Sequence, residues 1–533
     1  MTEMIKNPIL PGFHPDPCIV RAGDDYYIAT STFQWFPGVE IYHSRDLAHW
    51  QFVGRPLDEK RLLDMTGVPD SGGVWAPCLT YDDGMFYLVY SNMKAYRNYH
   101  KDVDNFLTVS KSIHGPWSDP VFLNSSGFDP SMFHDDDGKK YVLNQLWNHR
   151  DKEHSFDGIV LQEYDAENRC MKGSPVQIFK GSEIGLTEGP HLYKIDGKYY
   201  LFCAEGGTFY SHAVTVARSE KIEGPYEISP YNPLLTSYGH PGLRLQKCGH
   251  GSLVMTQEKE WYLVHLCARP NGNGGRCMLG RETAIQKLRM TEDGWFVIDH
   301  ASGLPQEEVE APALEGDYAE EKKVRYVFPE RLPDKFQNLR IPLGRNYLDF
   351  NKSKKSVILY GKESMESLHT QSLIGIRREH FDFLAETKID FRPVNYQQSA
   401  GMALYYDTTN YFYLSITWEE EKGRMLSLQA CDHGVIQNAG KIYGLPKEPH
   451  SIWMRMIVKN SKAQFYWSGD GDRFFPVGEI LDATQLSDDY YDEKKHGLRF
   501  TGTFIVLCCQ DTSGQRCPAE FEYLVYEPEV GAL

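Results

Sequence analysis

The feature that most constrains the fold of this chain is a repeat that runs through residues 1–305. Five aromatic, β-branched segments begin at positions 26, 86, 141, 199 and 261, so their spacings are 60, 55, 58 and 62 residues. Turns of acidic residues and glycine, such as YDDG and DDDG, precede most of these segments, and another short strand precedes each turn. With the segments that follow, each unit holds about four strands. Four-stranded units repeated around an axis are typical of a β-propeller, so the repeat predicts five blades over residues 1–305.

The rest of the chain has a different pattern. Residues 306–334 are charged and contain prolines, which is typical of a linker. Beyond them, segments such as NYFYLSITW and SIWMRMIVKN alternate apolar and polar residues between turns. We therefore predict an antiparallel β-sandwich over residues 335–533, and an all-β chain as a whole.

Carboxylates stand at one phase of the propeller repeat. The five inner strands open with HPDP, VWAP, GFDPS, LTEGPH and CGHGS, which place Asp16, Trp75, Asp129, Glu188 and His250 at matching positions. The first strand of each blade lines the channel of a propeller, so these side chains are expected to converge. Like charges brought together are costly and are tolerated mainly at functional sites. The repeat therefore predicts a site built on three acids.

Other aspartates receive a plain structural interpretation. A single Asp-Pro pair is commonly just a turn. Aspartates in acidic turns with glycine are interpreted in the same way, namely Asp82, Asp83, Asp135, Asp136, Asp137 and Asp196. Only the recurrence of acids at one phase of the repeat distinguishes the candidate site from these turns.

Charge and cysteine usage narrow the class of protein. The chain has 56 basic and 73 acidic residues, giving a net charge of −17, and no basic stripe, which argues against a nucleic-acid partner. It has no apolar run of about 18 residues and no signal-like segment, so we expect no membrane partner and a cytoplasmic location. Eleven cysteines without a C-x-x-C pair predict free thiols, with no metal-ligand pattern visible.

Five motifs resemble glycoside hydrolase family 43: NPILPGFHPDPCIV, GVWAPCLTYDDGMFYL, GFDPSMFHDDDGKKYVL, LTEGPHLYKIDGKYYLF and GRETAIQK. The length and the segment FTGTFIVLCCQDTSG resemble the two-domain β-xylosidase branch, and the likeness covers essentially the whole chain. It implies a five-bladed propeller, a concanavalin-like sandwich and hydrolysis with inversion at the anomeric carbon. The loop ARPNGNGGRCMLGRETAIQ is shorter than is expected of that branch, which bears on the rim of the pocket and on oligomer contacts.

The resemblance also assigns roles to the acids. It implies that Asp16 is the general base, Glu188 the general acid and Asp129 the group that orients the acid and raises its proton affinity. Inverting hydrolysis needs a base and an acid about 6.5–9.5 Å apart, with a water beside the base. Arg281 is expected near Asp16 and the sugar hydroxyls, although a lone arginine in Gly-Arg-Glu otherwise indicates a surface ion pair.

Further residues are candidates for substrate binding. Aromatic side chains lie on inner or adjoining strands, where they could line the pocket or simply fill the propeller core. We favour Trp75 for the pocket because it shares the phase of the acids. The resemblance adds a phenylalanine of the sandwich that closes the pocket, which implies exo action on small oligosaccharides. The full substrate-binding set is Arg281, Phe33, Trp75, Phe128, Trp147, Thr208, His250 and Phe504.

His250 has several open interpretations. It could bind a sugar hydroxyl, help to hold a water or a divalent cation in the channel, or be a satisfied interior histidine. No cofactor or metal is expected to be required for hydrolysis. The resemblance further implies a homo-oligomer, either a dimer or a tetramer.

The leading hypothesis is an exo-acting β-1,4-xylosidase that acts on xylo-oligosaccharides and has α-L-arabinofuranosidase side activity. A dominant arabinofuranosidase is the alternative enzyme. A retaining propeller of the invertase type needs a W-M-N-D-P-N-G-like stretch, which FHPDPCIV does not supply. A non-enzymatic sugar-binding propeller is the remaining alternative, because fold alone does not define function.

Overall fold

A computed structural model of the chain describes residues 4–150, 155–272, 274–312, 323–446, 448 and 450–528. It divides into two compact units. The first comprises residues 1–34, 38–275 and 281–318, and the second comprises residues 35–37, 276–280 and 319–533. Residues 313–322 of the predicted linker lie outside the described residues.

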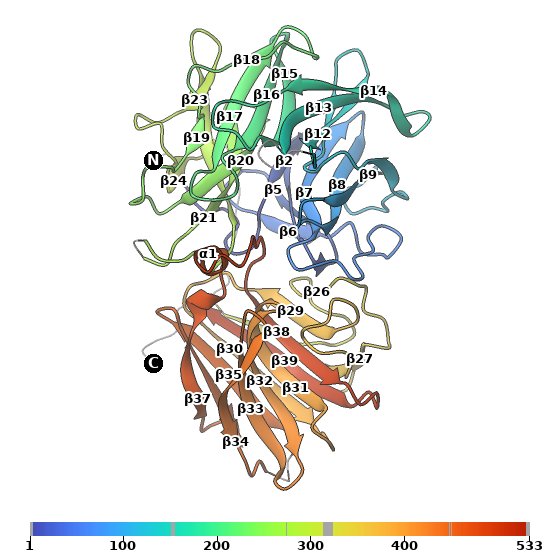
Figure 1. The fold of residues 1–533 in the computed structure, drawn as a ribbon, viewed down its shortest axis with the longest axis vertical. Coiled ribbons are helices and arrows are strands. Elements are labelled where there is room, and N and C mark those ends of the chain that lie inside the picture. The colour runs from blue at the N-terminus through green and yellow to red at the C-terminus, as the bar shows by residue number, and fades with distance from the viewer. Residues whose placement is uncertain are drawn as a thin grey trace. The chain divides into compact units, whose positions relative to one another are not determined.

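The described part of the first unit contains five antiparallel sheets with at least four strands each (Figure 1). The first sheet has the order β2 (Cys18–Ala22), β3 (Asp25–Thr30), β5 (Glu40–Ser44), β6 (Gln51–Gly54). The second has the order β7 (Gly73–Asp82), β8 (Met85–Ala95), β9 (Asp102–Ser110), β10 (Val121–Asn124). The third has the order β11 (Ser131–His134), β12 (Lys140–Trp147), β13 (Phe156–Asp165), β14 (Cys170–Phe179).

The fourth and fifth sheets complete the set. The fourth has the order β15 (Glu188–Ile195), β16 (Lys198–Glu205), β17 (Ala213–Ser219), β18 (Glu227–Ile228), and β19 (Leu235–Thr236) also pairs with β17. The fifth has the order β20 (Gln246–Met255), β21 (Trp261–Ala268), β22 (Glu282–Met290), β23 (Phe296–Ile298).

The first strands of the five sheets form a closed ring. β2 lies next to β7, β7 next to β11, β11 next to β15, β15 next to β20, and β20 again next to β2. The five repeated aromatic segments are the second strands, β3, β8, β12, β16 and β21. The predicted five-bladed propeller is therefore confirmed.

Residues from the two ends of this unit pack together. β1 (Met4–Lys6) pairs with β24 (Glu308–Glu310), so Met4 lies opposite Glu310 and Lys6 opposite Glu308. A buried cluster joins side chains of the first sheet to side chains of the fifth, including Ile28 and Val264. The first sheet thus completes its core with residues that come more than two hundred positions later in the chain.

The second unit is built on two antiparallel sheets. The larger sheet comprises β25 (Val324–Tyr326), β27 (Leu348–Asn351), β28 (Ser356–Tyr360), β39 (Pro518–Pro528), β30 (Phe383–Phe391), β35 (Ile452–Lys459), β36 (Lys462–Ser468) and β37 (Phe475–Asp482). The smaller sheet comprises β29 (Ser372–Arg377), β38 (Phe504–Asp511), β31 (Gln398–Asp407), β32 (Asn410–Glu419), β33 (Gly423–Asp432) and β34 (Val435–Ile442). β4 (Trp35–Phe36) pairs with β26 (Asn338–Leu339), and η1 (Ala483–Gln485) and α1 (Asp488–Glu493) precede β38.

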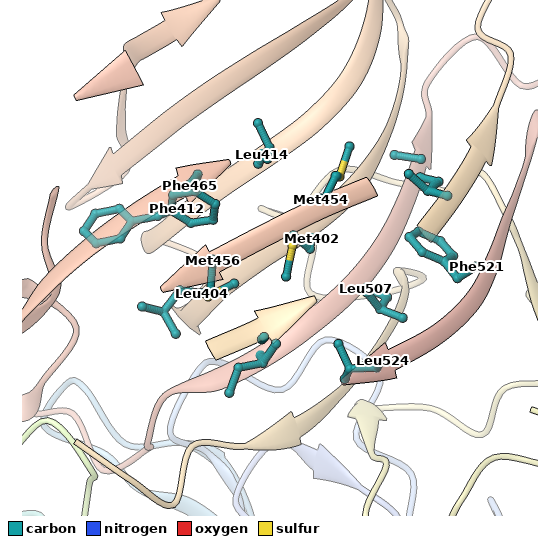
Figure 2. Close-up of a cluster of buried hydrophobic side chains, with 14 of the residues drawn as sticks. Met402, Leu404, Phe412, Leu414, Met454, Met456, Phe465, Leu507, Phe521 and Leu524 are labelled. Atoms are coloured by element: carbon teal, nitrogen blue, oxygen red, sulfur yellow. The ribbon is translucent and has the colours of Figure 1, made fainter. Parts of the chain in front are cut away.

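The core of the second unit is formed by side chains from both sheets. Figure 2 shows Met402 of β31 and Leu507 of β38 in the same cluster as Met454 of β35 and Phe521 of β39. β35 alternates strictly between buried and half-buried residues, as its period-two sequence predicts. The predicted β-sandwich is confirmed. Among the described residues, no helix is both long and apolar enough to cross a membrane.

Candidate active site

A left-handed backbone residue stands at the head of every inner strand. Asp16, Ala76, Asp129, Gly189 and His250 have φ values of 53°, 30°, 54°, 56° and 48°. A proline follows the first four and a glycine follows the fifth. Residues other than glycine adopt this conformation at a cost, and such strain is concentrated at functional sites.

The strained residue lies one position later than the sequence predicts in two of the five sheets. Asp16, Asp129 and His250 occupy it, but the residues that occupy it in the second and fourth sheets are Ala76 and Gly189. Trp75 and Glu188 therefore stand one residue before it. The pairing of β7 with β8 and of β15 with β16 shifts register at this point, so these strands accommodate an extra residue here.

Asp16 is buried and held by three neighbours. The Ser31 hydroxyl donates to Oδ2 at 2.7 Å, and Arg281 Nη1 donates to Oδ1 at 3.3 Å. His250 Nδ1 lies 3.7 Å from the same Oδ1. Ser31 in turn accepts a hydrogen bond of 2.8 Å from the backbone N–H of Ala76. The Asp16 carboxylate is thus held by groups from the first and fifth blades. One of these groups, the Ser31 hydroxyl, is itself held by Ala76 of the second sheet.

Asp129 and Glu188 are the other two acids of the site. The backbone N–H of Gly189, next to Glu188, donates to Asp129 Oδ2 at 3.1 Å, and both acids are buried. Burial, and then the charge of Asp16, raise the pKa of Glu188 to about 8, against the opposing charges of Lys101 and Arg281. Burial, and then Glu188 and Asp16, raise the pKa of Asp129 well above its ordinary value. The resemblance assigns the raised proton affinity of Glu188 to Asp129, whereas the carboxylate that raises its pKa in the structure is Asp16.

Lys101 adds a cation that the sequence analysis missed. Its ammonium group lies 4.3 Å from the ring centre of Trp147, 5.7 Å from that of Phe128 and 5.8 Å from that of Trp75. Burial lowers the pKa of Lys101 to about 8, while the charges of Glu188 and Asp129 oppose that shift. Cation–π contacts of this kind stabilise a charge that has lost much of its water.

The four predicted aromatic residues form a continuous row. Phe33 lies 6.1 Å from Trp75, Trp75 5.5 Å from Phe128, and Phe128 6.1 Å from Trp147, measured between ring centres. The Arg281 guanidinium lies 5.1 Å from the ring centre of Phe33. The row therefore runs from the arginine beside Asp16 to the tryptophan beside Lys101.

Two predicted residues lie apart from these contacts. Thr208 is half-buried in the loop after β16, and no contact among the described residues joins it to an acid. Phe504 belongs to the second unit, where it is fully buried and stacks on Trp35 with ring centres 3.6 Å apart. Their roles in substrate binding stay predictions.

The sequence analysis also missed a group of metal-capable side chains. Among the described residues, Cys18, Cys78 and His191 offer one ligand atom each, and these atoms lie within 4.8 Å of one another. Burial lowers the pKa of His191 to about 3, so its imidazole is neutral. The three residues are 60 and 113 positions apart, so no short spacing motif marks them. Their shared repeat phase could have done so. His250, where the sequence suggests a divalent cation, is not in this group.

The propeller and its three buried acids define the class of protein. A carboxylic acid that keeps its proton to about pH 8, together with a hydrogen-bonded aspartate, is what acid–base hydrolysis of a glycosidic bond requires. These features are typical of a glycoside hydrolase.

Comparison with known proteins identifies the family. The family model "Glycosyl hydrolases family 43" matches residues 5–296, and the model "Beta xylosidase C-terminal Concanavalin A-like domain" matches residues 327–527. The chain belongs to glycosyl hydrolase family 43. It is 45% identical to a β-xylosidase of Bacillus subtilis, an alignment that covers 98% of this chain and 99% of that one.

Two other relatives are similarly close. The chain is 44% identical to xylosidase/arabinosidase 43B of Humicola insolens over 98% of both chains. The crystal structure of xylan β-1,4-xylosidase from Bacillus halodurans is 48% identical, with a TM-score of 0.94, and covers 98% of this chain and 100% of that chain.

Proposed function

We propose that this chain is an exo-acting, inverting glycoside hydrolase that releases xylose from the non-reducing end of β-1,4-xylo-oligosaccharides. The observation that carries the proposal is the contrast between two buried acids. Glu188 keeps its proton to about pH 8, whereas Asp16 accepts hydrogen bonds from Ser31 and Arg281. The relatives named β-xylosidase support the substrate.

The proposed reaction is a single displacement. Asp16 accepts a proton from a water molecule as the water oxygen forms a bond to the anomeric carbon. The bond from that carbon to the glycosidic oxygen breaks, and Glu188 gives its proton to the departing oxygen. The product has the opposite anomeric configuration. Asp16 then gives its proton to solvent and Glu188 takes one from solvent, which restores both carboxyl groups for the next turnover.

Asp129 acts in this scheme as a positioning residue. Its Oδ2 accepts from the N–H of Gly189, so it holds the backbone on which Glu188 stands. The raised pKa of Asp129 favours its neutral form, which limits the negative charge beside Glu188. Removing the carboxyl group frees the segment that carries the acid.

Arg281 and the aromatic row supply the binding surface. The guanidinium can donate to sugar hydroxyls while it contacts Asp16 and Phe33. The row from Phe33 to Trp147 offers apolar ring faces, on which pyranose rings stack. We assign Thr208, His250 and Phe504 to the same binding role, on the resemblance of their motifs.

Time-resolved NMR of xylobiose digestion tests the proposal. We expect α-xylose as the first-formed product, because the β-linked anomeric carbon is inverted. Asp16→Asn and Glu188→Gln should fold and lose turnover by about 100- to 10,000-fold, in line with removal of a catalytic base or acid. Asp196→Asn is a matched control, because Asp196 also has a positive φ, of 48°, but lies exposed in a turn. First-formed β-xylose, or full activity of Glu188→Gln on xylobiose, would refute the proposal.

A dominant α-L-arabinofuranosidase is the second candidate. The name of the Humicola insolens relative joins both activities, and both substrates are pentosides. Comparing kcat/KM on aryl β-xyloside and aryl α-L-arabinofuranoside decides between them. We expect the xyloside to be preferred, and a large preference for the arabinofuranoside would reverse the assignment.

Three further properties belong to this proposal. We place the protein in the cytoplasm, which suits eleven cysteines that are all free thiols. We expect a dimer or tetramer, which sedimentation velocity can test. Hydrolysis is expected to need no cofactor, and a divalent cation near His250 would appear as a change of activity after chelation and re-addition of Ca²⁺ or Mg²⁺.

A further inference from the structure

A second ring of side chains follows the strained residues of the inner strands. Two positions after each strained residue stand Cys18, Cys78, Ser131, His191 and Ser252. All five are buried, and they lie on β2, β7, β11, β15 and β20, which neighbour one another around the channel. The proposed hydrolysis uses none of them.

The two sulfur atoms lie at a separation that suits a shared metal ion. Cys18 Sγ and Cys78 Sγ are 3.7 Å apart, and His191 places a ring nitrogen within 4.8 Å of both. Zinc binds thiolate at about 2.3 Å and imidazole at about 2.0–2.1 Å in tetrahedral geometry, so its ligand atoms lie about 3.6–3.8 Å from one another. The sulfur pair already has this spacing, and the imidazole needs a shift of about 1.2 Å at most.

One polar atom of the same ring lacks a hydrogen-bond partner among the described residues. The Ser131 hydroxyl is buried and has no hydrogen-bond partner among the described residues. Ser252 Oγ, which accepts from the backbone N–H of Ile19 at 3.1 Å, lies 3.9 Å from Cys18 Sγ. Buried polar groups are normally paired, so an unpaired hydroxyl in a ring that also holds two sulfurs and an imidazole points to a missing ligand.

We propose that Cys18, Cys78 and His191 bind one thiophilic metal ion, with Zn²⁺ as the ion of choice. Binding of Zn²⁺ releases the two thiol protons, and the two thiolates and the neutral imidazole become ligands. A water or the Ser131 hydroxyl occupies the fourth position. Sulfur ligands select zinc and similar soft ions over Ca²⁺ and Mg²⁺, which prefer oxygen.

The site is linked to the active site through the chain itself. Cys18 is separated from Asp16 by Pro17 alone, and proline has a fixed φ, so a pull on the sulfur is transmitted to the aspartate. The His191 ring also lies 6.3 Å from that of His250, which contacts Asp16. The ion would therefore lie next to residues 16–18, the segment that carries the proposed general base.

Cobalt and zinc titrations of the purified full-length protein, kept reduced, test the proposal. We expect one Co²⁺ per chain with a thiolate-to-cobalt charge-transfer band, displaced by one equivalent of Zn²⁺. Cys18→Ser and Cys78→Ser should lose the band, and His191→Gln should weaken binding at least tenfold. Cys248→Ser, at another buried thiol, is the matched control, and Cys170→Ser removes the exposed thiol.

A measurement on the wild type protects the test against misfolded variants. X-ray absorption of the zinc-loaded protein should show two sulfur neighbours at about 2.3 Å together with nitrogen or oxygen neighbours. Absence of the cobalt band in the wild type, its persistence in a Cys18→Ser/Cys78→Ser double variant, or a zinc shell without sulfur would overturn the proposal. None of these outcomes depends on the proposed hydrolase activity.

Discussion

Ser31→Ala is the most direct test of how the base is held. The Ser31 hydroxyl donates to Asp16 Oδ2 at 2.7 Å and accepts from the N–H of Ala76 at 2.8 Å, so one oxygen connects two inner strands. A hydrogen bond to a charged group contributes about 1.5–3 kcal/mol. If the whole of that energy serves to orient the base in the transition state, its loss lowers kcat by about 10- to 150-fold.

The assay compares kcat, KM and thermal stability on an aryl xyloside. KM should change little, because Ser31 acts through Asp16 and not on the sugar. Ser91→Ala is the matched control, because Ser91 is the sixth residue of the second aromatic segment, as Ser31 is of the first, and donates to Asn105 Oδ1 at 2.8 Å. It should lower stability and leave kcat near the wild-type value.

The stability of Ser31→Ala should fall as well. The buried N–H of Ala76 loses its acceptor, which costs about 1–3 kcal/mol. A kcat within twofold of wild type would refute the claim that this hydroxyl orients the base. An equal loss of kcat in Ser91→Ala would show that the effect is not specific to Asp16.

Three further predictions concern the acid and its neighbours. The value of kcat/KM should fall above about pH 8 as Glu188 loses its proton. Lys101→Met should move that fall to higher pH, because the charge of Lys101 lowers the pKa of Glu188. An unchanged pH profile in this variant would contradict the electrostatic effect of Lys101 on Glu188. Glu188→Gln should be more stable than the wild type at alkaline pH, because a carboxyl group whose folded pKa is raised from 4.5 to about 8 loses its stabilising contribution as the pH rises through that range. Thermal unfolding of both proteins from pH 4 to pH 9 measures the difference in stability. A difference that stays constant over this range would count against the raised pKa. Gly189→Ala should abolish activity, because its Cβ would lie 2.8 Å from His250 Nε2. Gly185→Ala is the control: it has a similar positive φ with open space around it, and it should cost only about 1 kcal/mol of stability. An active, stable Gly189→Ala variant would contradict the close packing of Gly189 against His250.

Periodicity was sufficient to predict the fold and the three acids. The five aromatic segments repeat because each blade needs a buried second strand, and the inner strand before it repeats with them. A side chain at one phase of that repeat must therefore reach the same channel in every blade. This is why Asp16, Asp129 and Glu188 could be grouped although they are far apart in the sequence.

The groups that surround the acids could not be predicted in the same way. Lys101 precedes β9 in a segment with no repeat signature, and its aromatic neighbours come from β7, β12 and the loop before β11. The one-residue offset at Gly189 depends on a register shift, which hydrophobic pattern does not report. Residues 35–37 and 276–280 belong to the second unit although they lie within the propeller repeat, because contacts formed far along the chain decide their membership.

The packing of the first sheet against the fifth has a consequence for synthesis. Ile28 and Tyr42 leave the ribosome early, but Val254 and Val264, against which they pack, follow more than two hundred residues later. At about 5–20 residues per second, the first blade waits roughly 10–40 s for its partner. Throughout that time the apolar face of the first blade is uncovered. The nascent chain is therefore most exposed to aggregation just before the last blade emerges, and chaperone binding is expected to be concentrated in that interval.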